Sequence, residues 1–253
     1  MLAQHTIERL RQLRLKGMIE ALQNQARSLE FIGLTFEEQI GILIDCEYTH
    51  RQNRRLARLL TDARLKLPAC IEDIDYQQSR GLDRSLIRDL SSCYWIESHL
   101  HVLITGPSGV GKSYLACALG NAACRHGLKT RYYRLSLLLS ELAIARGDGS
   151  YSKMLNHLSR YDLLILDDWA LSSFSLDQSR DLLEIVERRN EKGSLLIASQ
   201  IPIDSWYQAL PDPTLADAIL DRIVHTSYKI LLTGESMRKI GAGKRLSKGR
   251  QTD

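Results

Sequence analysis

The fold is decided by one stretch of the chain: Val102-Leu103-Ile104-Thr105-Gly106-Pro107-Ser108-Gly109-Val110-Gly111-Lys112-Ser113. Its first four residues form an apolar run typical of a buried parallel strand, and its last eight form a complete G-x-x-x-x-G-K-S phosphate loop. The residues that follow, 114–119, predict the first turns of a helix. Strand, glycine loop and helix together predict a nucleotide-binding site.

The loop residues have separate expected tasks. The glycines let the backbone curl so that successive N–H groups point at phosphate oxygens. Lys112 supplies positive charge for the β- and γ-phosphates, and the Ser113 hydroxyl is placed to bind Mg²⁺. The competing interpretation is a flexible surface loop, which the flanking strand and helix disfavour. The residues expected to bind the nucleotide are Gly106, Pro107, Ser108, Gly109, Val110, Gly111, Lys112 and Ser113.

A second motif consists of four apolar residues, 163–166, followed by Asp167 and Asp168. Acids at the carboxyl end of a buried parallel strand lie beside the phosphate loop. Asp167 is therefore expected to bind both the cofactor and its Mg²⁺, through water, and Asp168 to orient or deprotonate the attacking water. ATP and Mg are the expected cofactors, and ATP hydrolysis is the expected reaction.

Two further polar residues are candidates for the reaction. The apolar run 194–198 predicts a strand that ends in Ser199 and Gln200. If this strand lies between the two motif strands, one of these side chains faces the γ-phosphate, where an amide can bind the attacking water. A helical pattern over 217–222 delivers Arg222, and an arginine contributed in trans can stabilise the transferred charge. The alternative for Arg222 is an ordinary salt bridge.

From residue 100 onward, strand and helix patterns alternate, which predicts an α/β fold with a five-stranded parallel sheet covered on both faces. Before it, helical periodicity over 6–30 and again over about 36–59, the latter opened by a Thr35–Glu38 capping box, predicts a small all-helical domain. The strand candidates are 101–105, 129–134, 161–167, 194–199 and 228–232. The expected divisions are a helical N-terminal domain over 1–68, a linker and entry segment over 69–99, the ATPase core over 100–235 and a basic tail over 236–253.

Composition and charge limit the functional classes. No apolar stretch is long enough to span a bilayer, so we expect a cytoplasmic protein with no membrane partner. The five cysteines are widely spaced without a C-x-x-C pair, which argues against a disulfide framework or a zinc site. The net charge of +4 is unevenly distributed, because basic residues gather in the second helix and in the tail. Such clusters are typical of nucleic-acid contact, although a solvated helix face and a disordered tail give the same pattern. The candidate contacts in the helix are Arg51, Arg54, Arg55 and Arg58.

Taken together, the motifs resemble the IstB family of AAA+ helper ATPases of insertion sequences, which are similar to the helicase loader DnaC. The resemblance covers nearly the whole chain and rests on 106–113, 163–168, 198–200, 212–222 and 234–238. It implies an AAA+ P-loop NTPase that binds ATP between subunits of a homo-oligomer. Gln200 then corresponds to the first sensor, Arg222 to the arginine finger and Arg238 in placement to a second sensor. Asp168 stands where many AAA+ proteins have glutamate, which implies slow hydrolysis.

The resemblance also implies a biological role, as an ATP-dependent regulator of transposition that assembles on double-stranded DNA and recruits a partner transposase. Helices expected over about 136–160 resemble an insertion that faces DNA in initiator proteins, so Arg146 and Lys153 are expected to touch phosphates. Such contacts bring affinity without sequence readout. Three alternatives share the phosphate loop: a DnaC-like helicase loader, a small-molecule kinase, and a DNA-bending module that binds ATP only as a structural ligand.

Overall fold

The computed structural model describes residues 4–25 and 33–239, and the chain divides into two compact units, residues 1–58 (unit 1) and 59–253 (unit 2). The division falls inside a continuous helix, ten residues before the end of the expected helical domain. Two expected features lie outside the described residues: the part of the first helix at residues 26–30 and the tail beyond residue 239.

Unit 1 contains α1 (Gln4–Gln12), α2 (Lys16–Gln25) and most of α3 (Phe36–Ala63). The single helix expected over 6–30 is wrong, because the chain turns at Arg14, whose φ is 59°. The capping box is confirmed: the Thr35 N–H donates to the Glu38 carboxylate at 2.7 Å, and the Glu38 N–H donates to Oγ1 of Thr35 at 3.3 Å.

The turn between α1 and α2 brings α2 against α3 within unit 1. A Cβ on Gly17 would lie only 2.6 Å from the carbonyl oxygen of Cys46, so the two helices approach too closely for any other residue. Glu47 on α3 accepts hydrogen bonds from the N–H groups of Gly17 (2.8 Å) and Met18 (3.3 Å). This buried carboxylate caps the first turn of α2, where free N–H groups need acceptors.

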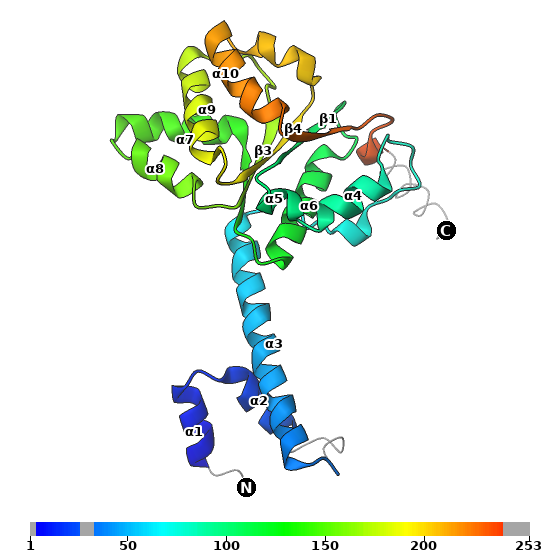
Figure 1. Ribbon diagram of the computed structural model, residues 1–253, viewed down its shortest axis with the longest axis vertical. Helices are drawn as coiled ribbons and strands as arrows, with labels where there is room; N and C mark the ends of the chain where they lie inside the picture. Colours follow the sequence, from blue (N-terminus) through cyan, green and yellow to red (C-terminus); the bar gives the residue numbers. More distant parts are fainter. Residues whose placement is uncertain (1–3, 26–32, 240–253) are drawn as a thin grey trace, which may run out of the picture. The chain divides into compact units, whose positions relative to one another are not determined.

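Unit 2 is built on a parallel sheet with the strand order β2-β3-β4-β1-β5 (Figure 1). The expected α/β fold and its five-stranded parallel sheet are confirmed. As the site requires, β4 lies between the two motif strands β1 and β3. The strands are β1 (His101–Thr105), β2 (Thr130–Arg134), β3 (Leu163–Trp169), β4 (Ser194–Ser199) and β5 (Ser227–Leu231).

Alternate strand residues enter two separate core clusters, one on each face of the sheet. On β1, Val102 and Ile104 pack on the side of α4, α5 and α6, whereas Leu103 packs on the side of α7, α8, α9 and α10 (Figure 1). The near-continuous apolar runs of β1, β3 and β4 follow from this burial on both faces. The helices are α4 (Arg84–Ser91), α5 (Tyr94–Glu97), α6 (Lys112–Arg125), α7 (Leu135–Gly147), α8 (Tyr151–Leu158), α9 (Leu176–Arg189) and α10 (Pro213–Val224), with short 3₁₀ helices η2 (Ile71–Asp73), η3 (Ile203–Ser205) and η4 (Tyr207–Ala209).

The sequence pattern predicts one helix over 82–95, but the structure has two shorter helices there, α4 and α5. Cys93 has φ 62° and separates α4 from α5, which lets Trp95 turn inward and donate its indole N–H to the Leu90 carbonyl at 2.9 Å. Within the residues that the structure describes, none of the helices is both long and apolar enough to cross a membrane.

Candidate nucleotide-binding site

The phosphate loop connects the carboxyl end of β1 to the first residue of α6, as the motif predicts. Gly106 has φ 143°, and a Cβ there would lie 2.1 Å from the carbonyl oxygen of Leu232, so only glycine fits. The Lys112 ammonium is buried and donates to the carbonyls of Gly106 and Pro107, each at 2.7 Å. Burial lowers the pKa of Lys112, and the nearby carboxylates of Asp167 and Asp168 oppose that shift. The loop thus holds its lysine among inward-facing backbone groups.

Asp167 lies at the end of β3 with only 1% of its surface exposed. Its Oδ2 accepts hydrogen bonds from the Ser113 hydroxyl and the Tyr132 hydroxyl, both at 2.6 Å, and its Oδ1 accepts from the N–H of Asp168 at 2.9 Å. Burial, and then the hydrogen bond to Asp167, raise the pKa of Tyr132, so this phenol stays protonated and donates. The predicted magnesium pair, Ser113 and Asp167, is therefore assembled in the structure.

Asp168 differs from its neighbour in backbone and in partner. The register between β3 and β4 shifts between Leu166 and Trp169, and within this bulge Asp168 has φ 60°, a left-handed conformation that is costly outside glycine. Its carboxylate accepts from Nε of Arg134 on β2 at 2.9 Å. The bulge turns two successive acids toward different partners, Ser113 for the first and Arg134 for the second.

Lys112, Ser113, Arg134 and Asp168 line a cleft of about 690 Å³, whereas the buried Asp167 is not among its lining residues. Gln200 lies in its lining, whereas the Ser199 hydroxyl donates to the Trp169 carbonyl at 2.9 Å and so has a structural partner. The lining holds five cationic side chains, Lys66, Arg80, Lys112, Arg134 and Arg238, against three carboxylates, Asp73, Asp75 and Asp168. A positively charged cleft of this volume suits a nucleoside triphosphate.

The residues present also suit Mg²⁺. Among the described residues there is no group of three or more His, Cys, Asp or Glu side chains that could hold a metal alone. The Ser113–Asp167 pair offers two oxygens, and Mg²⁺ commonly takes one or two protein ligands and completes its shell with water and phosphate oxygens. The site therefore fits a magnesium ion that arrives together with the nucleotide.

Comparison with known proteins agrees with this geometry. Residues 8–244 match the family model described as IstB-like ATP binding protein. The chain belongs to the IstB-like ATP-binding protein family. It is 44% identical over 239 residues to a putative insertion sequence ATP-binding protein, y4pL, of Sinorhizobium fredii, which covers 94% of this chain and 98% of that relative. It is also 44% identical to the IS1162 putative ATP-binding protein of Pseudomonas fluorescens, over 80% of this chain and 88% of that relative.

Several solved structures share the fold of this IstB-like protein at low sequence identity. DnaI superposes with a TM-score of 0.58 at 19% identity, over 70% of this chain and 94% of DnaI. The DnaC helicase loader superposes with a TM-score of 0.53 at 18% identity, over 65% of this chain and 96% of that chain. AMPPCP-bound DnaA from Aquifex aeolicus superposes with a TM-score of 0.58 at 17% identity, over 73% of this chain and 56% of that chain. The expected AAA+ fold is confirmed.

Arg222 of the IstB-like chain lies on α10 and is absent from the lining of the cleft. Its guanidinium donates to the Ala218 carbonyl at 2.7 Å and lies 3.3 Å from the Glu187 carboxylate on α9. The side chain is 33% exposed, so this ion pair can exchange with water or with another anion. Within one chain, Arg222 therefore forms an ordinary salt bridge with Glu187, which is the alternative that the sequence left open for this residue.

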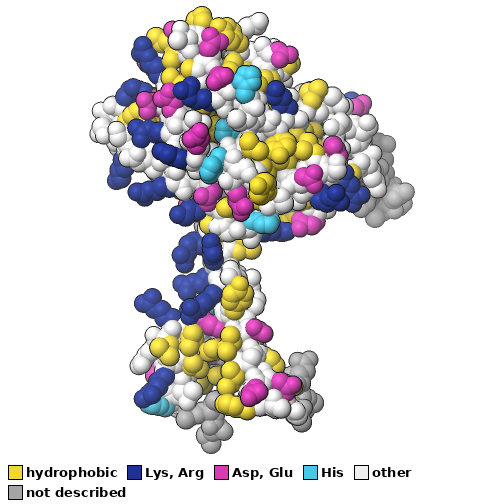
Figure 2. All heavy atoms as spheres, in the orientation of Figure 1, with side chains coloured by type: hydrophobic (Ala, Val, Ile, Leu, Met, Phe, Trp, Pro, Cys, Tyr) yellow, Lys and Arg dark blue, Asp and Glu magenta, His cyan; other side chains and the backbone are white. Residues whose placement is uncertain are grey.

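The basic residues expected to meet DNA lie on three helices, α3, α7 and α8. Arg51, Arg54, Arg55 and Arg58 are exposed along α3, where dark blue side chains gather in Figure 2. Arg51 also pairs with Glu47 at 2.7 Å. On the α7–α8 pair, Lys153 is exposed, whereas Arg146 pairs with the buried Asp181 and stacks on the ring of Tyr151 at 4.3 Å. Arg146 is thus engaged inside unit 2, and Lys153 is the more accessible of the two.

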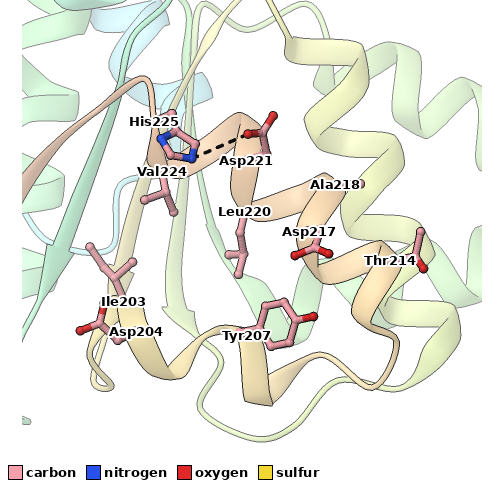
Figure 3. A pocket seen from close by; sticks show the side chains of 10 residues that line it. All are labelled: Ile203, Asp204, Tyr207, Thr214, Asp217, Ala218, Leu220, Asp221, Val224 and His225. Carbon is pink, nitrogen blue, oxygen red and sulfur yellow. Dashed lines mark ion pairs between the residues drawn. The ribbon is translucent and has the colours of Figure 1, made fainter.

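A second hollow of unit 2, of about 750 Å³, follows α10 and η3 and does not touch the phosphate loop (Figure 3). Three of its lining side chains are Asp204, Asp217 and Asp221, and its lining contains no lysine or arginine. Because its charge has the wrong sign for phosphate, this hollow is not the nucleotide site.

Sequence reasoning missed four side chains around the nucleotide cleft: Lys66, Arg80, Tyr132 and Arg134. Arg80, which is buried, donates to the Val110 carbonyl at 3.2 Å and so braces the loop from the entry segment. None of the four lies in the two motifs. Tyr132 and Arg134 could have been noticed because they are polar residues at the carboxyl end of a predicted strand, whereas Lys66 and Arg80 precede the sheet and give no such signal.

Proposed function

We propose that this chain is an ATP-dependent regulator of transposition, which hydrolyses ATP with Mg²⁺, assembles on double-stranded DNA as a homo-oligomer, and recruits and stimulates a partner transposase. The observation that carries the proposal is the buried Asp167 held 2.6 Å from the Ser113 hydroxyl beside the phosphate loop, in a chain of the insertion-sequence ATP-binding family.

The proposed chemistry follows from the cleft. Lys112 and the loop N–H groups bind the phosphates, and Ser113 and Asp167 hold Mg²⁺, which neutralises charge on the transferred phosphoryl group. Asp168 activates the attacking water and Gln200 orients it. Because Asp168 is held by Arg134 at 2.9 Å, its carboxylate is engaged in the isolated chain, which supports slow basal hydrolysis.

The proposed assembly places Arg222 of one subunit at the nucleotide of the next. The partly exposed position of Arg222 and its exchangeable pair with Glu187 support this role, because a surface ion pair contributes only about 0–1 kcal/mol. The DNA contacts proposed are the four arginines of α3 and Lys153, with Arg146 available only if it leaves Asp181.

The test is to measure binding to duplex and single-stranded DNA with ATP, ADP or no nucleotide, while particle size is followed by light scattering. ATP-dependent growth of the particle on duplex DNA is expected, and the Lys112→Ala variant should lose it. Unchanged assembly by that variant would contradict the role of the loop. A small particle that binds no DNA under any condition would favour a small-molecule kinase.

The second candidate is a helicase loader, which the likeness to DnaI and DnaC favours at the level of the fold. It shares the same nucleotide chemistry and differs in its partner. A clear preference for single-stranded DNA, with binding to a replicative helicase, would support it over the transposition role.

A further inference from the structure

A cation that belongs to no motif lies beside the predicted magnesium pair. Lys66 follows the end of α3, and its Nζ lies 3.5 Å from Oδ2 of Asp167. The same oxygen accepts the hydrogen bond from the Ser113 hydroxyl at 2.6 Å. The ammonium group of Lys66 therefore sits against the two side chains that suit Mg²⁺.

The buried carboxylate of Asp167 needs a nearby positive charge. Its side chain is only 2% exposed, and an unpaired ionised carboxylate in such a place is strongly unfavourable. Tyr132 and Ser113 donate hydrogen bonds to it but carry no charge. The charge of Lys112 also acts on Asp167, but this ammonium group gives its hydrogen bonds to the carbonyls of Gly106 and Pro107. Within the described part of the chain, the ion pair of Asp167 is the one with Lys66.

The Lys66 side chain can leave this position without moving the backbone. It is 42% exposed on a flexible four-carbon stem, unlike the buried Lys112. The residues around it are fixed, because Ala63 is fully buried and Leu65 packs against the core cluster that contains α6. Rotation of this one side chain is enough to remove the ammonium group from the Asp167 oxygen, which keeps its hydrogen bonds from Ser113 and Tyr132.

We propose that Lys66 is a resident counter-ion of Asp167, which neutralises this carboxylate in the absence of Mg²⁺ and gives way when the ion binds. The inference rests on the proposed binding of Mg-ATP in this cleft. Lys66 cannot keep its place once a divalent cation shares the same carboxylate oxygen, because like charges at that distance repel. Without Mg²⁺, Lys66 lowers the negative potential that an incoming triphosphate meets.

The test is to titrate the full chain with ATP by calorimetry, once in EDTA and once in excess Mg²⁺. Lys66→Met removes the charge at similar side-chain length. In EDTA this variant should bind ATP about tenfold more weakly than the wild type, whereas in Mg²⁺ the two should agree within about twofold. Arg64→Met, which removes an exposed charge two residues earlier, should match the wild type in both buffers, and Lys66→Arg should restore binding in EDTA.

A second measurement needs no variant. The rate at which Lys66 is acetylated by a water-soluble acylating reagent, followed by peptide mass spectrometry, should rise in the wild type when ADP is replaced by ADP with Mg²⁺. An equal loss of affinity for Lys66→Met in both buffers, or no loss in EDTA, would overturn the counter-ion role. A wild type that binds no ATP in either buffer would instead overturn the proposed function.

Discussion

The two compact units bury their apolar residues very differently. Unit 2 packs both faces of its sheet into large clusters, whereas in the described part of unit 1 the buried apolar residues are Ile19 and Ala21. Unit 1 also leaves apolar side chains exposed at four-residue spacing along α3: Phe36, Ile40, Ile44 and Tyr48. Unit 2 therefore brings the phosphate loop and the Ser113–Asp167 pair together within one chain, while unit 1 depends on a few contacts and presents an apolar stripe.

The largest effect that separates the units is expected at Lys112. Lys112→Ala removes the buried ammonium of the phosphate loop, so ATP affinity should fall by about 100-fold or more. The helix content of unit 1 should not change. Calorimetric titration together with circular dichroism checks both parts, and retained ATP affinity would place the triphosphate elsewhere.

The next effect is expected in unit 1 at Glu47. Glu47→Ala leaves the N–H groups of Gly17 and Met18 without their buried acceptor, which should destabilise unit 1 by about 2 kcal/mol. ATP affinity should stay at the wild-type value. Limited proteolysis measures the local opening, with Asp45→Ala, an exposed acid on the same helix, as the matched control. Equal protection of the two variants would show that the cap is unimportant.

A smaller effect is expected at Arg134 in unit 2. Arg134→Ala frees the Asp168 carboxylate from its partner at 2.9 Å, so basal phosphate release should rise about fivefold, the scale of a partly exposed ion pair. Arg134→Lys should remain close to the wild type. A slower rate in the alanine variant would mean that Arg134 assists the reaction instead of restraining Asp168.

The smallest effect tests the stripe of unit 1. Ile44 is 52% exposed, so Ile44→Ser should change the free energy of unfolding of the single chain by less than about 0.5 kcal/mol. Ile19→Ser, at a site that is 8% exposed, should cost about 2 kcal/mol or more. Urea unfolding at low protein concentration gives both values, and equal costs would mean that the stripe is covered.

The same contrast explains how much the sequence could predict. The strands β1, β3 and β4 and the phosphate loop are each formed by one short stretch of sequence, so apolar runs and glycine spacing were enough to find them. Asp167, Asp168 and Gln200 follow because strands of a parallel sheet end at one edge. Lys66, Arg80 and Arg134 reach the cleft from other segments, and their positions depend on tertiary packing that no local pattern records.

In unit 1, tertiary contacts overrode the periodicity. The pattern over 6–30 is helical throughout, yet the contacts of Gly17 and Glu47 require a turn before α2. The resemblance to the IstB family supplied the role of Arg222, whose position on α10 shows only a surface ion pair with Glu187. A function that needs a second subunit leaves little trace in one chain.

The left-handed backbone of Asp168 has a consequence for how this protein can change over time. At φ 60°, glycine would fit with less strain than aspartate, by about 1 kcal/mol. Selection for thermal robustness alone would therefore favour replacing Asp168, while selection for turnover would keep it. If Asp168 activates water as proposed, copies of this protein that no longer hydrolyse ATP should drift toward glycine at this position, which makes it a marker of catalytic decay.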